Sequence, residues 1–119
     1  MRGLTLVLAE PSATRLRTAL TMALAAQALG GRVRLFVDAE AVPVVAGPLR
    51  EGDVAFATAG LPSTVQLLDE ALVAGVRIVL CQTGLALAGL SAEALDPRFD
   101  YGGIVAMLAD LGDDRLVVA

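Results

Sequence analysis

Short apolar runs alternate with segments of helical periodicity along the first third of this chain. The residues from 4 to 9 and from 33 to 37 are almost continuously apolar, which is typical of strands that are buried on both faces. Between them, apolar side chains recur at helical spacing from Leu16 to Gln27. Ser12 can cap the start of that helix, and Gly30 can end it in a left-handed conformation. The pattern predicts a strand, a helix and a second strand.

The middle of the chain has a weaker pattern. Residues 41–46 fit a short helix or a turn, and residues 53–59 alternate weakly, as in a strand or an extended loop. The pattern becomes clear again at Ser63 and Gln66, whose spacing is that of a capping box. A helix is therefore expected to run from there to Leu72 and to end at Gly75.

The last third again combines strands and helices. The pattern predicts a strand over residues 76–80, a short helix or turn over 84–90, a helix over 103–111 and a last strand over 116–118. Ser91 is expected to cap a further turn. Strands that alternate with helices over short connections form α/β folds. The expected structure is a single three-layer α/β/α domain over residues 1–119, with a mostly parallel sheet of about five strands, of flavodoxin or Rossmann type.

Composition excludes nucleic acid as a partner. The net charge is -4, and the nine basic residues, all arginines, are scattered along the chain. Binding to a phosphate backbone depends on clustered positive charge. Aromatic residues make up only 3% of the chain, which argues against base stacking.

Hydrophobic residues reach 56%, but no apolar stretch has the roughly 18 residues of a membrane helix. The first apolar run stops at Glu10, which is too short for a signal peptide. A single cysteine fits a reducing compartment. The sequence therefore predicts a cytoplasmic protein that does not enter the membrane.

The chain has no histidine and no lysine, which removes many mechanisms at once. A Ser-His-Asp or Cys-His arrangement, a Schiff base and a Walker phosphate loop all need one of these residues. The turn around Ser12 has hydroxyls that could touch a phosphate, but it lacks the glycines of a dinucleotide site. Asp38 and Glu40 follow the second strand without a third ligand nearby. We expect no cofactor and no metal.

Cys81 marks the best candidate site. It lies where the strand over 76–80 meets Gln82, Thr83 and Gly84, which open a helix. In an open α/β sheet, ligands bind beyond the carboxyl ends of the strands, and unpaired N–H groups at a helix start can lower the pKa of a thiol. Asp38 is expected at the same edge. The alternative is a packing role, because a free cysteine often serves as a small buried hydrophobe.

The residues around Cys81 resemble those of the DsrE/DsrF-like family of sulfur-relay proteins, some of which are labelled peroxiredoxin-like. The likeness rests on the run from Gly75 to Gln82, on Gly89-Leu90, Glu93 and Leu95, and on the stretch from Gly102 to Leu108, with a weaker match over 19–36. The resemblance implies an oligomeric α/β/α domain. It also implies that the cysteine matching Cys81 carries sulfane sulfur as a persulfide.

These observations lead to one main hypothesis and two alternatives. In the first, Cys81 accepts sulfur from a donor protein and passes it to an acceptor thiol, and the backbone N–H groups of Gln82, Thr83 and Gly84 stabilise the sulfur anion. In the second, the chain is a non-catalytic, oligomeric binding or regulatory subunit. A thiol peroxidase fits less well, because the chain has no second cysteine to resolve the oxidised thiol.

Overall fold

The computed structural model describes residues 1–47 and 53–119. Five parallel strands form one sheet in the order β4-β3-β2-β1-β5. The strands are β1 (Leu4–Leu8), β2 (Val33–Val37), β3 (Arg77–Cys81), β4 (Asp100–Gly102) and β5 (Arg115–Val118). The α-helices are α1 (Ala13–Ala28), α2 (Val42–Ala46), α3 (Asp53–Thr58), α4 (Thr64–Val73), α5 (Gln82–Ala88) and α6 (Ile104–Ala109), and two 3-10 turns are η1 (Ala39–Ala41) and η2 (Ala92–Ala94).

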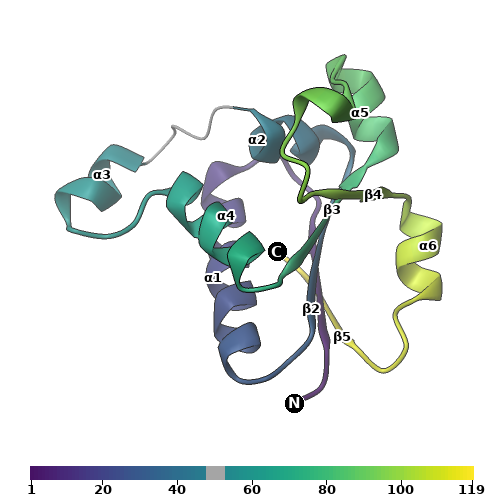
Figure 1. Ribbon diagram of the computed structural model, residues 1–119, viewed down its shortest axis with the longest axis horizontal. Coiled ribbons are helices and arrows are strands. Elements are labelled where there is room, and N and C mark those ends of the chain that lie inside the picture. Colours follow the sequence, from purple (N-terminus) through teal and green to yellow (C-terminus); the bar gives the residue numbers. More distant parts are fainter. Residues whose placement is uncertain (48–52) are drawn as a thin grey trace.

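The order of the strands decides which face each helix covers. From β1 to β2 to β3 the chain moves across the sheet in one direction, whereas the connection from β4 to β5 runs back to the opposite edge. Because crossover connections between parallel strands are right-handed, this reversal places α6 on the face opposite α1 and α4. Figure 1 shows α1 and α4 on one side of the sheet and α6 on the other. The three-layer α/β/α fold that the sequence predicts is confirmed.

The face under α1 is the hydrophobic core. Side chains alternate between the two faces of a strand, and the register aligns Leu6, Leu35 and Ile78 across β1, β2 and β3. All three are fully buried, as are Leu16 and Leu20 of α1. Aliphatic side chains of this size allow close packing between helix and sheet. Removing these apolar side chains from water stabilises the fold.

The face under α6 is more polar. Thr5 of β1 and Arg34 of β2 point to this side and are buried. The Thr5 hydroxyl donates to the Asp114 carboxylate at 3.0 Å and accepts from Arg34. Asp114, whose side chain is 1% exposed, also pairs with Arg32 at 3.2 Å. This network joins β1 and β2 to the turn before β5.

Most of the predicted elements are confirmed, but the assignment of the strands contains two errors. Residues 53–59 are expected as a strand or extended loop, but residues 53–58 form helix α3, and the sequence pattern gives no sign of strand β4. Helix α3 has no buried residue, so its weak hydrophobic pattern carried little information. β4 has three residues and lies at a sheet edge, which is too short for a recognisable alternation.

Two of the three predicted serine caps agree with the structure. Ser12 accepts a hydrogen bond from the backbone N–H of Arg15, and Ser63 and Gln66 form both bonds of the capping box. Ser91 differs, since its hydroxyl donates to the carboxylate of Glu93 and caps no helix N–H. Within the described residues, no helix has the length and apolar character needed to cross a membrane.

Removing the buried carboxylate tests the network on the second face. Asp114→Ala leaves the Arg34 guanidinium buried without its charge partner, so the free energy of unfolding should fall by about 3–5 kcal/mol. Asp113→Ala removes an exposed carboxylate from the same turn and should change it by less than about 0.5 kcal/mol. Urea denaturation of both variants measures the difference. Equal effects would mean that Asp114 contributes nothing beyond local charge.

Candidate functional site

Cys81 lies at the carboxyl edge of the sheet, where two neighbouring strands end together. It is the last residue of β3 and the N-cap of α5, and its residue surface is 7% exposed. β2 pairs with β3 in parallel, so the turn η1 that follows β2 meets α5 at this edge. Figure 1 shows α5 and α2 close together at this end of the sheet. The thiol is therefore enclosed by segments that follow two different strands.

Backbone and side-chain groups near Cys81 lower the pKa of its thiol, although the sulfur accepts no cap bond from an N–H of α5. Burial raises the pKa of the Cys81 thiol, but hydrogen bonds from the backbone of Ala39, Gly84 and Thr83 and from the Thr83 side chain together lower that pKa below its ordinary value. Hydrogen bonds to the charged form of a group favour that form. The site stabilises a thiolate with neutral donors, in a chain that has no histidine to act as a base.

Ala39 is the residue that sequence reasoning missed. Its φ of 30° is the only positive value among the described residues other than glycine. Such a conformation costs free energy in an L-amino acid and is kept only where the surrounding structure imposes it. Here it accompanies an interaction of the Ala39 backbone with Cys81 that lowers the pKa of the thiol. An alanine gives no sequence signal for a left-handed backbone, so this donor could not be predicted.

Gly84 permits the close approach of α5 to η1. A Cβ atom added at Gly84 would overlap the carbonyl oxygen of Ala39 and the side chain of Val42. Gly84 is buried, and its backbone also helps to lower the pKa of the Cys81 thiol. It therefore contributes to the site in two ways, as a donor and as a residue small enough to let Ala39 reach the sulfur.

The remaining predicted site residues differ in their relation to the Cys81 thiol. Gln82 and Thr83 are exposed next to Cys81, and Thr83 helps to lower the pKa of the thiol, whereas Gln82 is not among the described residues that do so. Asp38 directly precedes Ala39, and its side chain makes no cap bond to η1. Ser12 lies at the same edge of the sheet, and its hydroxyl is occupied in capping α1. In the part of the chain that the structure describes, no acidic or cysteine cluster is placed to hold a metal.

The fold and the site together define a class of protein, an α/β/α domain with a cysteine at the carboxyl edge of a parallel sheet. Comparison with family models makes the assignment specific. The model of the DsrE/DsrF-like family matches residues 1–116, and the chain belongs to that family. The resemblance seen around Cys81 is thereby confirmed. A search of curated protein sequences gives no match.

Solved structures support the same fold. The crystal structure of YchN from E. coli is 20% identical, with a TM-score of 0.70 over 100% of both chains. MTH1491 from Methanobacterium thermoautotrophicum, described as a protein of unknown function, is 15% identical, with a TM-score of 0.66 over 99% of this chain and 98% of its own. At these identities the similarity concerns the fold alone.

The pH dependence of thiol reactivity tests the hydrogen bonds to Cys81. The thiolate is the reactive form, so the alkylation rate with iodoacetamide should rise with a midpoint at lower pH in the folded protein than in urea. Thr83→Val removes the hydroxyl donor and should raise that midpoint, while Thr18→Val on α1 should leave it unchanged. If Thr83→Val leaves the alkylation midpoint unchanged, the Thr83 hydroxyl does not stabilise the thiolate.

Enlarging Gly84 tests the packing of α5 against η1. Gly84→Ala should displace Ala39 or Val42, lower the free energy of unfolding by about 1–3 kcal/mol and raise the alkylation midpoint. Ala86→Leu adds more bulk to the same helix at an exposed position and is the matched control. Urea denaturation and the alkylation profile measure the two effects. If Gly84→Ala matches wild type in both, the close approach has no consequence for the thiol.

Proposed function

We propose that this protein is a sulfur-relay protein that carries sulfane sulfur as a persulfide on Cys81. The observation that supports this most directly is the position of Cys81 at the carboxyl end of β3 and the start of α5, where the backbone of Ala39, Thr83 and Gly84 lowers the pKa of its thiol. Membership of the DsrE/DsrF-like family points to the same chemistry. The proposal includes a cytoplasmic location and protein partners that donate and accept the sulfur.

The first step is a thiol exchange in which no net oxidation occurs. The Cys81 thiolate attacks the outer sulfur of a donor persulfide, the donor's S–S bond breaks, and a new S–S bond forms on Cys81. The donor leaves as a thiolate, so charge is conserved. The N–H groups that favour the thiolate also suit a persulfide anion at the same position.

The second step reverses the roles. A thiolate of the acceptor attacks the outer sulfur of the Cys81 persulfide, and Cys81 leaves as a thiolate. A leaving thiol departs faster when its pKa is lower, so the same hydrogen bonds assist this step. Because Cys81 is buried, the partner must reach it at the exposed rim formed by Gln82 and Thr83. Asp38, next to Ala39, belongs to the same contact region in this proposal.

An oligomeric binding subunit is the second candidate, and the burial of Cys81 favours it. In that case the thiol only packs, and the exposed apolar side chains of α6 and β5 would contact further copies of this chain. These side chains are Ile104, Val105, Leu108, Leu116 and Val118. Covering such a surface is a common reason for self-association.

Intact-protein mass after incubation with a sulfane-sulfur donor distinguishes the two candidates. Wild type should gain a reducible mass of one sulfur atom, about 32 Da, and Cys81→Ser should gain none. Reductant should restore the original mass. If the folded protein gains nothing while its unfolded thiol still reacts, Cys81 is a packing residue and the binding subunit becomes the better interpretation.

A further inference from the structure

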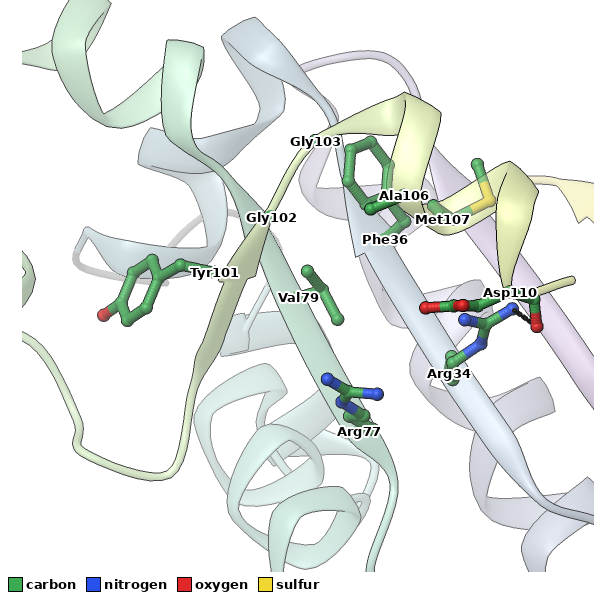
Figure 2. Close-up of a pocket in the computed structure, with 10 residues that line it drawn as sticks. All are labelled: Arg34, Phe36, Arg77, Val79, Tyr101, Gly102, Gly103, Ala106, Met107 and Asp110. Carbon is green, nitrogen blue, oxygen red and sulfur yellow. Dashed lines mark hydrogen bonds between the residues drawn. The ribbon is translucent and has the colours of Figure 1, made fainter.

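A cleft lies on the second face of the sheet, between α6 and strands β2, β3 and β4 (Figure 2). Its apolar lining comes from Phe36, Val79, Ala106 and Met107, and Arg34 and Arg77 lie at the end opposite Gly103. The cavity has a volume of about 70 Å³. It continues into a more polar hollow of about 320 Å³, which shares Arg34, Arg77 and Asp110 with it and adds Arg32. Cys81 lines neither part.

Arg34 and Arg77 place two like charges side by side. They are register partners on the neighbouring strands β2 and β3, so both side chains leave the sheet on the same face. Adjacent parallel strands lie about 4.8 Å apart, and like charges directly opposite each other destabilise a sheet. Arg34 is only 8% exposed, which limits screening by solvent. Asp114 and Asp100 each pair with one of these arginines, at 3.7 and 2.8 Å, and Asp110 also lines the cleft, so an added anion would be recognised by the remaining N–H donors of the two guanidinium groups.

Groups of the protein accept hydrogen bonds from only some of the N–H donors of these two guanidinium groups. Nε and Nη2 of Arg34 donate to Thr5 and to the carbonyl of Asp110, and Nε of Arg77 donates to Asp100 at 2.8 Å. Within residues 1–47 and 53–119, Nη1 of Arg34 and both terminal nitrogens of Arg77 make no hydrogen bond to the protein. Asp114 is buried behind Arg34 and is shared with Arg32. Donors remain for a ligand.

We propose that this cleft binds a small organic carboxylate, with the carboxylate group between Arg34 and Arg77 and the apolar part against Phe36, Val79 and Met107. Guanidinium groups match the geometry of carboxylates and bind them with charge-assisted hydrogen bonds. The apolar lining favours a carboxylate with a hydrocarbon portion over a fully hydrated oxyanion. The site is separate from Cys81 and does not depend on the sulfur chemistry.

Methyl NMR of methionine offers a direct test, because Met107 lines the cleft while Met22 lies on α1, on the other face of the sheet. Protein with ¹³C-labelled methionine methyl groups would be titrated with benzoate, with the neutral analogue benzamide and with inorganic phosphate. Benzoate should shift the Met107 signal saturably and leave Met22 in place, and benzamide should give no saturable shift. An equal response to benzamide would mean an apolar cavity without anion recognition. Tighter binding of phosphate than of benzoate would overturn the carboxylate assignment.

Variants then assign the effect to the arginine pair. Arg77 has a 57% exposed side chain, so Arg77→Gln should fold normally and weaken benzoate binding about tenfold or more. Arg115→Gln, at an exposed arginine that starts β5 and does not line the cleft, is the matched control. Cys81→Ser should bind benzoate as wild type does, whatever the outcome for sulfur transfer. If Arg77→Gln and Arg115→Gln weaken binding equally, general charge explains the effect and the proposal fails.

Discussion

The close contact between α5 and the turn that follows β2 is the constraint on which the candidate site depends. Neighbouring parallel strands deliver α5 and η1 to the same edge of the sheet, but only a residue without a side chain at 84 lets their backbones approach. Val42, which faces Gly84, is fully buried in the core. The position of Ala39 against the sulfur is therefore fixed by the packing of the core, and the strained backbone of Ala39 can persist.

The two faces of the sheet differ in polarity and burial because their helices cover them unequally. Under α1 and α4 the side chains of β1, β2 and β3 are aliphatic and buried. On the other face, α6 has six residues and buries only Met107. That partial cover leaves room for a buried ion network around Asp114 and for a cleft with a charged end. It also leaves apolar side chains of α6 and β5 exposed, and these form a surface that a partner could contact.

The order of elements could be predicted because most of the strands and helices carry strong local signals. Runs such as 33–37 and the capping box at Ser63 specify structure within a few residues of sequence. The pattern predicts the wrong structure, or none, where tertiary contacts determine the secondary structure. β4 is a strand only because Asp100, Tyr101 and Gly102 pair with the end of β3, and α3 buries no side chain that would show a helical face.

The candidate site divides in the same way. Cys81, Thr83 and Gly84 were predictable, since a cysteine at the junction of an apolar run and a helix start is a local pattern. Ala39 comes from a segment some forty residues earlier, and only the pairing of β2 with β3 brings it to the sulfur. Its backbone acts as the donor, so the identity of its side chain carries no information about the contact.

A thiol whose pKa is raised by burial and lowered by hydrogen bonding suits both steps of the proposed relay. In a relay the same sulfur must attack in one step and leave in the next. Lowering the pKa of a thiol increases the thiolate fraction and improves the leaving group, but it also weakens the nucleophile, with a Brønsted coefficient of about 0.4–0.5. At Cys81, burial opposes the hydrogen bonds that lower the pKa. Burial therefore limits how far the hydrogen bonds lower the pKa of the thiol. A moderate decrease in the pKa lets the same sulfur attack in the first step and leave in the second.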